Sequence, residues 1–215
     1  IIKTWKLPLQ KIVIAKWLKE MVNEAGEECT IIRNGLDFQS FGIDKSIKDR
    51  NPSKISMLYH KLEWKGSNVG IDALKIVKKT IPNLEVDLFS TSKRNEFIPD
   101  WMNFHEKPKN LRKLYNDSSI FLSPSLSEGW GLPRAEAMQC GCATIITNVN
   151  GHNDYGINGQ DYLMVNPNDP DDLAQSIIKL ISDNELRNNI SKSVNELVKK
   201  FTWENSYQQM KILFK

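Results

Sequence analysis

Hydrophobic and polar positions in the middle of the chain follow two alternating patterns. Short apolar runs bounded by turn residues predict buried strands, whereas apolar residues three or four positions apart predict helices. The expected strands are Ile55–Tyr59, Leu84–Ser90, Ile120–Ser123 and Ala143–Thr147. The expected helices between them are Val69–Thr80, Lys109–Asp117 and Leu132–Gln139. This alternation predicts an α/β fold, with a Rossmann-like parallel sheet flanked by helices on both faces.

The N-terminal part carries helical periodicity. Apolar residues recur at helical spacing over residues 9–25, and Gly26 is a typical helix end. A short strand is expected at residues 29–32. We therefore expect residues 1–26 to be a linker helix and residues 27–200 to form a single domain.

The C-terminal part is expected to form three helices, at residues 170–182, 184–200 and 203–214. Asp169 is a favourable capping residue for the first of them, and Pro170 suits the first helical position.

Composition narrows the class of protein. Of the 215 residues, 40% are hydrophobic and 26% are charged, as in an ordinary globular domain. A net charge of +3 without a basic run interleaved with aromatic residues predicts no nucleic-acid partner. The apolar stretches are far shorter than the roughly 20 residues that span a bilayer, so no transmembrane segment is predicted.

The ends and the cysteines indicate the setting of the chain. It begins with Ile1 and has neither an initiator methionine nor a signal-peptide pattern, which indicates a fragment or a processed chain. The count of three cysteines is odd, and Cys140-Gly141-Cys142 lacks metal-ligand spacing. These features favour a reduced, cytoplasmic setting, with peripheral membrane association of the full-length protein left open.

The segment that carries the chemistry runs from Ser123 to Met138, with the sequence SPSLSEGWGLPRAEAM. A predicted strand ends there, a glycine-rich loop follows, and a helix begins near Pro133. The first N–H groups of a helix have no partner within it, and the helix dipole places partial positive charge there. Gly129 and Gly131 allow a ligand to approach the main chain closely. The segment therefore predicts an anion site suited to a phosphate.

Two carboxylates frame this loop. Glu128 lies just before the glycines, and Glu136 lies one turn inside the predicted helix, where side chains lean back toward the N-terminus. We expect both to face one pocket and to accept hydrogen bonds from sugar and ribose hydroxyls. Capping and solvation of a helix start is an alternative interpretation. A dinucleotide-binding fingerprint is a weaker one, because its third glycine would fall at Arg134.

A second pocket wall is predicted from the loop after the strand at residues 55–59, because ligands of open α/β sheets bind at the carboxyl ends of strands. Lys61 and Lys65 of this loop could supply point charges for a diphosphate. They could equally be two solvated lysines among the 29 basic residues. The stretch is not a P-loop, because the residue order differs and the upstream glycine is missing.

Several motifs, in chain order, resemble the group 1, or family 4, retaining glycosyltransferases. Glu128 and Glu136 match the E-x7-E motif of that family, with Trp130 in its usual Phe position. The stretch IIRNGLD at residues 31–37 resembles its I-P-N-G-V-D element. The stretch FTWE at residues 201–204 resembles the F-S-W-E that begins its last helix. The resemblance covers nearly the whole chain.

The resemblance implies a role for each matching residue. Glu128 is the catalytic candidate, which contacts the donor sugar near the reacting centre, and Glu136 is expected to hold the ribose. Lys65 matches the lysine of the diphosphate-binding loop. Lys61 replaces an arginine of that loop, and lysine cannot form the bidentate fork of arginine. The main chain expected to contact the donor comprises Gly129, Trp130, Gly131 and Leu132.

The family has the two-domain GT-B fold, and this chain resembles the C-terminal, donor-binding domain. The resemblance implies that residues 27–200 bind a nucleotide-diphosphate sugar. It also implies that residues 201–215 form a helix that crosses back to an absent N-terminal acceptor-binding domain. The acceptor would be a glycan, a lipid or a protein. We expect a hexosyltransferase-type enzyme without cofactor or metal, weakly active or inactive without that domain. A non-catalytic glycosyltransferase-like partner or chaperone is the alternative.

No metal site is expected from the remaining acids and histidines. Asp169-Pro170-Asp171 superficially resembles the metal-binding D-x-D of the other glycosyltransferase fold, but its place at a helix start predicts capping. His60, His105 and His152 lack metal-ligand spacing. His105 is expected to be a loop histidine with its hydrogen bonds satisfied.

Overall fold

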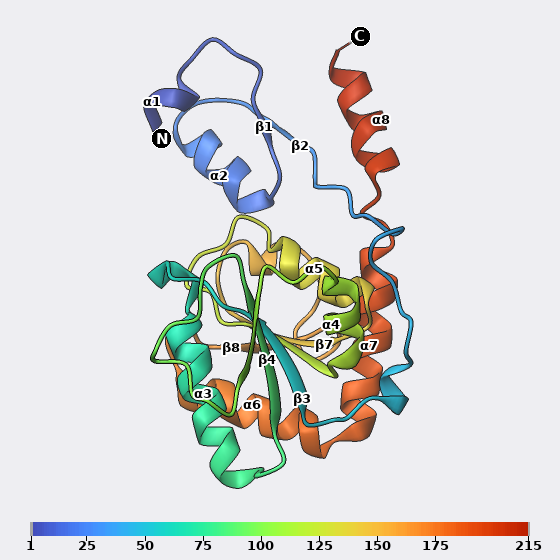
Figure 1. The fold of residues 1–215 in the computed structure, drawn as a ribbon. Coiled ribbons are helices and arrows are strands. Elements are labelled where there is room, and N and C mark those ends of the chain that lie inside the picture. Colours follow the sequence, from blue (N-terminus) through green and yellow to red (C-terminus); the bar gives the residue numbers. More distant parts are fainter. Residues whose placement is uncertain (1, 215) are drawn as a thin grey trace.

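The computed structural model describes residues 2–214, and its main body is a parallel sheet between two layers of helices (Figure 1). The six strands lie in the order β5-β4-β3-β6-β7-β8, and every neighbouring pair is parallel. The strands are β3 Lys54–Leu58, β4 Glu85–Ser90, β5 Asn103–Glu106, β6 Ile120–Ser123, β7 Ala143–Thr147 and β8 Leu163–Val165. The predicted α/β fold with a parallel sheet is confirmed.

Helices cover both faces of the sheet because its strands are apolar on both sides. On one face, Ile55 and Met57 of β3 belong to a core cluster with Leu74 and Ile177 of two covering helices. On the other face, Phe121 of β6 packs among side chains of the opposite helix layer. The first layer consists of α3 Ser67–Thr80 and α6 Pro170–Ser182. The second consists of α4 Leu111–Asp117, α5 Leu132–Gln139 and α7 Asn184–Val198.

The first part of the chain forms a small βαβ unit beyond the sheet (Figure 1). β1 Ile12–Val13 pairs in parallel with β2 Thr30–Ile31, and α2 Lys16–Glu24 connects them. A short helix, α1 Ile2–Trp5, precedes β1. The helix predicted over residues 9–25 is therefore wrong in its first half. β-branched side chains favour extended backbone there, and the helix begins only after β1.

The central strands and the helices between them lie within a few residues of their predicted bounds. The strand predicted at residues 29–32 is β2, but it pairs with β1 outside the main sheet. The hydrophobic pattern of the sequence did not predict β5 and β8. β5 has the largely polar sequence NFHE, β8 has three residues, and both are edge strands. The division into residues 1–26, 27–200 and 201–215 stays a prediction.

The three C-terminal helices are confirmed as α6, α7 and α8 Trp203–Leu213. Asp169 caps α6, because its Oδ1 accepts a hydrogen bond from the N–H of Asp172 at 2.9 Å. Pro170 is the first residue of that helix. The D-x-D-like stretch is therefore a helix cap, as predicted.

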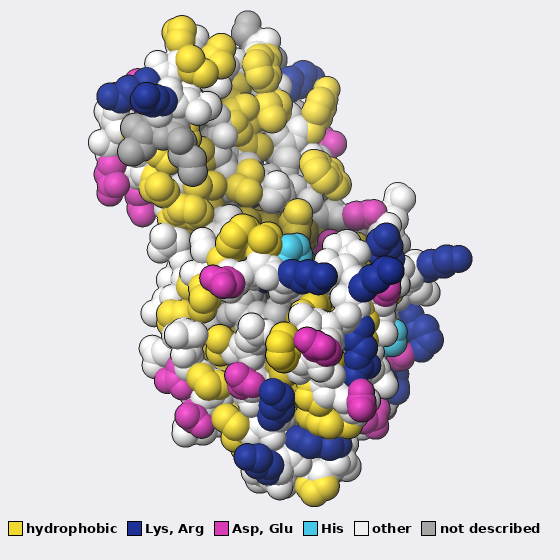
Figure 2. Space-filling view, turned by 60° about the vertical axis from the view of Figure 1, so that its left-hand side comes forward, with side chains coloured by type: hydrophobic (Ala, Val, Ile, Leu, Met, Phe, Trp, Pro, Cys, Tyr) yellow, Lys and Arg dark blue, Asp and Glu magenta, His cyan; other side chains and the backbone are white. Residues whose placement is uncertain are grey.

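Helix α8 extends away from the sheet, on the side of the βαβ unit (Figure 1). Trp203, Tyr207 and Phe214 are 64%, 58% and 69% exposed. Leu7 and Leu9 of the N-terminal part are also exposed. Hydrophobic side chains gather over this end of the molecule (Figure 2). Within residues 2–214, no helix combines the length and the apolar character that crossing a membrane requires.

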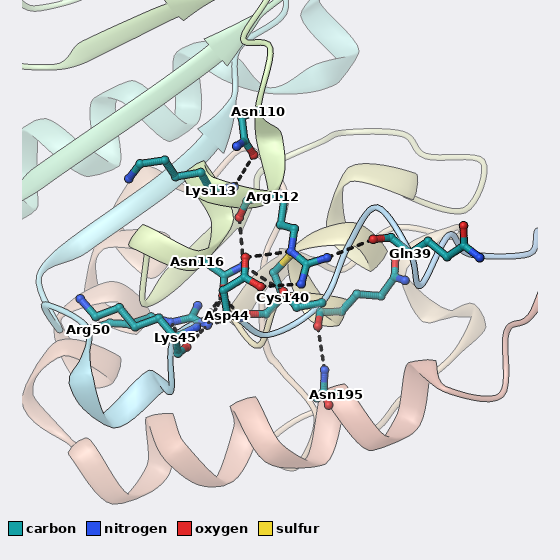
Figure 3. A network of polar contacts seen from close by, with 12 residues as sticks. Gln39, Asp44, Lys45, Arg50, Asn110, Arg112, Lys113, Asn116, Cys140 and Asn195 are labelled. Atoms are coloured by element: carbon teal, nitrogen blue, oxygen red, sulfur yellow. Dashed lines mark hydrogen bonds and ion pairs between the residues drawn. The ribbon is translucent and has the colours of Figure 1, made fainter.

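Polar contacts fasten the segment before β3 to α4 and to the end of α5 (Figure 3). The guanidinium of Arg112 in α4 bonds both carboxylate oxygens of Asp44. The side-chain oxygen of Asn116 accepts hydrogen bonds from the N–H groups of Asp44 and Lys45. Arg50 is 4% exposed. Its guanidinium donates to the main-chain carbonyls of Lys45, Tyr115, Ser118 and Cys140.

Candidate functional site: the crevice between β3 and β6

The strand order creates a topological switch point between β3 and β6. The chain leaves β3 toward β4, and it leaves β6 toward β7 on the opposite side. The loops at the carboxyl ends of these two strands therefore diverge, and ligands of open α/β sheets bind in the crevice between such loops. All the predicted donor-site residues lie on these two loops or in the first turns of α5.

The two loops contact each other directly. The N–H of Leu126 donates to the carbonyl of Trp64 at 2.7 Å. Gly66 has a left-handed backbone with φ +62°, and a Cβ at this position would overlap the carbonyl oxygen of Pro124. Both the backbone conformation and the close approach therefore require glycine at position 66. The loops form one continuous wall of the crevice.

Lys65 and Glu128 form an ion pair across the two loops. The Nζ of Lys65 lies 2.6 Å from Oε1 of Glu128, and the side chains are only 24% and 10% exposed. The hydroxyl of Ser125 donates to the same carboxylate oxygen at 2.8 Å. The structure thus brings together two residues that were predicted, from separate loops, to share a pocket.

The main chain before α5 presents free hydrogen-bond donors. In the described part of the chain, the N–H groups of Trp130, Gly131 and Leu132 have no protein acceptor. Gly131 adopts φ +88° and immediately precedes the helix. Free N–H groups at the positive end of a helix dipole favour an anion. The geometry needed for the predicted phosphate site is therefore present.

The buried side chain of His152 packs against this loop. His152 is fully buried, its Nδ1 donates to the carbonyl of Thr147 at 2.9 Å, and its Nε2 bonds the hydroxyl of Ser123 at 3.0 Å. Burial lowers the pKa of His152 to about 3, so the ring is neutral. Its Cδ2 would lie 3.6 Å from a Cβ at Gly131, so the ring is directly adjacent to the loop.

The side chains of Trp130 and Arg134 belong to the core. Trp130 is 2% exposed, and its ring centroid lies 5.0 Å from that of Tyr155 and 5.2 Å from that of Phe201. Arg134 stacks on Tyr155 at 4.0 Å from the ring centroid and donates to the carbonyl of His152. Only the backbone of Trp130 is therefore placed to contact a ligand. The third glycine of a dinucleotide fingerprint allows close packing of helix and strand, and here the large side chain of Arg134 stands at that position.

Glu136 lies on α5 and faces α4. Its Oε2 accepts a hydrogen bond from the hydroxyl of Tyr115 at 3.2 Å. Burial raises the pKa of Glu136, and the bond from Tyr115 opposes that rise. Glu136 is not among the residues that line the small cavity around Lys65 and Glu128. The expectation that both glutamates face one pocket stays a prediction, and the structure adds that the carboxylate of Glu136 is hydrogen-bonded to α4.

Lys61 lies apart from this centre. It is exposed and lines a separate cavity of about 420 Å³, together with His60 and Phe97. The ring of His60 turns back on its own loop, where its Nδ1 accepts a hydrogen bond from the N–H of Leu62 at 3.1 Å. The structure therefore does not bring Lys61 to the ion pair.

Contacts between the βαβ unit and the main body of the chain carried no sequence signal. Nε1 of Trp17 in α2 donates to the carbonyl of Gly129 at 3.0 Å. Asp154 accepts hydrogen bonds from Arg33 at 2.8 Å and from the N–H of Lys16 at 2.7 Å. In the sequence, Trp17 is one apolar position of a helical pattern. Only the tertiary fold shows that its indole N–H also bonds the main chain of Gly129. The βαβ unit is thereby tied to the predicted donor loop.

The remaining histidine and acid positions do not assemble a metal site. His105 bonds Asp87 at 2.8 Å, so it is satisfied as predicted, but it lies in β5 and not in a loop. Among residues 2–214, no group of three or more His, Cys, Asp or Glu side chains could hold a metal ion. Metal-independent chemistry stays a prediction.

A larger cavity of about 600 Å³ lies between the βαβ unit and α8. Lys16, Arg33 and Lys200 line it, but Arg33 is already paired with Asp154. The crevice between β3 and β6 is the stronger candidate, because it combines a switch point, free main-chain donors and a partly buried ion pair.

Comparison with known proteins identifies the family. Residues 42–196 match the family described as "Glycosyl transferases group 1". The chain belongs to this family. A glycosyltransferase of Methanocaldococcus jannaschii with no assigned function is 37% identical over 101 residues, which cover 47% of this chain and 28% of that protein. The suspected resemblance is therefore confirmed.

Solved structures agree with this group 1 glycosyltransferase fold. The C-terminal domain of a group 1 glycosyl transferase from Francisella tularensis superposes with a TM-score of 0.66 at 21% identity, covering 77% of this chain and 97% of that one. HepE from Anabaena, in complex with UDP and glucose, superposes with a TM-score of 0.81 at 16% identity, covering 96% and 63%. At such identities the likeness shows the fold, here one half of a GT-B enzyme.

The chain spans less than two thirds of the length of the curated relatives that it matches.

Proposed function

We propose that this chain binds the nucleoside diphosphate of a sugar donor and serves as the donor-binding half of a retaining hexosyltransferase. The main support for the proposal is the set of charged and main-chain groups that meet at the switch point between β3 and β6. The Lys65–Glu128 pair lies beside α5, whose preceding N–H groups at Trp130 and Gly131 have no protein acceptor among residues 2–214. This combination offers donors for a diphosphate and an acceptor for sugar hydroxyls.

Each group in the crevice has a task in this proposal. The phosphates accept hydrogen bonds from the main chain at Trp130, Gly131 and Leu132, and the ammonium of Lys65 neutralises them. Glu128 accepts from the hydroxyls of the sugar near the reacting carbon. Glu136, one turn further along α5, accepts from the ribose. Gly129 leaves the space for the sugar beside the main chain.

The ion pair must rearrange when the donor binds. The cavity between Lys65 and Glu128 measures about 10 Å³, which is room for a water molecule and not for a phosphate. We propose that the diphosphate draws the ammonium of Lys65 away from Glu128 and so frees the carboxylate for the sugar. The exposed Lys61 lies apart from the ion pair, so in this proposal its charge acts on the diphosphate from a distance, without the fork of arginine.

The acceptor side belongs to a further domain in this proposal. Leu7 and Leu9 near the two-stranded sheet of β1 and β2 are exposed, and so is the apolar face of α8. An N-terminal acceptor-binding domain that packs there would place a glycan, lipid or protein acceptor next to Glu128. Without such a domain, transfer is slow, because the acceptor is not positioned at the reacting carbon.

The first test is calorimetric titration of the chain with uridine, guanosine and adenosine diphosphate. Uridine diphosphate is included because it is bound in the Anabaena relative. We expect at least one to bind. Lys65→Ala and Glu136→Ala should each weaken binding by about tenfold or more, because each removes a charge-assisted contact.

The matched control is Lys75→Ala, which removes an exposed lysine on α3 that pairs with Asp72 one turn away. It should leave the affinity unchanged. Failure of all three nucleotides to bind the wild-type chain would show that the crevice is not a donor site.

A further inference from the structure

The hydroxyl of Tyr115 is a buried polar group whose partner is a predicted ligand-binding residue. Tyr115 is fully buried in α4, and its hydroxyl donates to Oε2 of Glu136. The ring packs edge-on against Phe89 and Phe121, with centroids 5.6 and 5.7 Å away. Phenylalanine would fill the same aromatic cluster without a polar group to satisfy. Packing therefore does not explain the hydroxyl, whereas the carboxylate does.

The hydrogen bond changes what the carboxylate of Glu136 can do. Burial raises the pKa of Glu136, and the hydroxyl of Tyr115 opposes that rise by donating to the charged form. A carboxylate has two oxygens with about four acceptor sites, and Tyr115 occupies one of them. Among residues 2–214 no other side chain or main-chain group bonds this carboxylate, so its other sites stay available while the bond from Tyr115 orients it. The arrangement suits a group that must accept two neighbouring hydroxyls.

Tyr115 is itself held in a fixed position. Its main-chain carbonyl accepts hydrogen bonds from the guanidinium of Arg50 at 3.1 Å and from the thiol of Cys142 at 3.1 Å. The next residue, Asn116, bonds the main chain of the segment before β3, so the C-terminal end of α4 is fastened on two sides (Figure 3). The hydroxyl can therefore serve as a rigid reference for the side chain of Glu136.

We propose that Tyr115 is a positioning residue for nucleotide recognition: its hydroxyl holds Glu136 so that the free carboxylate sites accept the hydroxyls of the ribose. This inference rests on the proposed donor site and assigns how that site selects ribose. Tyr115 touches no ligand itself and acts through Glu136.

The test compares Tyr115→Phe with a matched control. Tyr162→Phe also removes one hydroxyl from a buried tyrosine, there bonded to the carbonyl of Gly156 at 3.1 Å. Each variant and the wild-type chain are titrated with whichever of uridine, guanosine or adenosine diphosphate binds most tightly, and with its 2′,3′-dideoxy form. We expect Tyr115→Phe to weaken binding of the ribose form about fivefold to tenfold.

The dideoxy form should bind Tyr115→Phe as it binds the wild-type chain, which also shows that the variant is folded. Tyr162→Phe should leave both affinities unchanged. Because the hydroxyl acts through the carboxylate, the double variant Tyr115→Phe/Glu136→Gln should bind the ribose form no more weakly than Glu136→Gln alone.

Four results would overturn the inference. Tyr115→Phe could bind the ribose form as the wild-type chain does, or lose equal affinity for the ribose and the dideoxy forms. Either result would leave the donor site in place but make Tyr115 merely structural. An additive loss in the double variant would separate Tyr115 from Glu136. Absence of nucleotide binding by the wild-type chain would overturn the proposed donor site, and this inference with it.

Discussion

Replacing Arg50 by methionine should lower the free energy of unfolding by about 3–5 kcal/mol, because it leaves buried acceptors without their donor. Arg50 is 4% exposed. Among the described residues, its guanidinium donates hydrogen bonds to main-chain carbonyls and to the side-chain oxygen of Asn116, and no carboxylate forms an ion pair with it. It joins three parts of the chain that are distant in sequence. These are the segment before β3, the end of α4 and the end of α5.

Chemical denaturation of Arg50→Met and of two comparison variants measures this effect. Arg50→Lys keeps the charge but cannot fork to several carbonyls, so most of the loss should remain. Arg112→Met removes the exposed ion pair to Asp44 and should cost little. A loss of less than about 1 kcal/mol in Arg50→Met would mean that the carbonyl groups find other partners.

Acid should destabilise the chain through His152 over the range from about pH 6.5 down to about pH 3. The pKa of His152 is about 3 in the folded chain, against an ordinary value of 6.5, because the ring is buried and Arg134 lies near. Between these values the unfolded chain binds a proton that the folded chain does not. The stabilisation is therefore complete above pH 6.5 and is lost as the pH falls, by up to about 5 kcal/mol.

The variant His152→Asn isolates this contribution. Asparagine can still donate to the carbonyl of Thr147 but takes up no proton in this range. Denaturation curves measured from pH 7 to pH 4 should show a shallower loss of stability in the variant than in the wild-type chain. Equal slopes would mean that His152 takes up its proton in the folded chain at its ordinary pKa.

The parts of the fold that sequence could predict depend on local rules. The central strands are runs of apolar residues between turns, so their pattern is visible without any tertiary knowledge. The cap at Asp169 follows from the chemistry of one side chain next to Pro170. The loop around Glu128 was recognisable because glycines and a helix start must follow each other in the chain.

The parts that were missed depend on partners distant in sequence. β1 is two residues long and exists because β2 lies beside it, so helical periodicity over the same region was misleading. Tyr115 resembles any core tyrosine until α5 brings Glu136 to its hydroxyl. Arg50 stands in a polar stretch of the sequence that carries no hydrophobic pattern, yet it is buried because three segments close around it.

The most direct test of the donor site is to map the bound nucleotide on the chain by amide NMR. Uridine, guanosine or adenosine diphosphate, whichever binds, is added to the isotope-labelled chain. The account predicts that the largest shifts occur at the amides of Trp130, Gly131 and Leu132, with small changes at Arg33 and at Ser206 of α8, which line the other cavity. Binding with its largest shifts at Arg33 and Ser206 would place the ligand in the cavity beside α8 and contradict the donor site between β3 and β6.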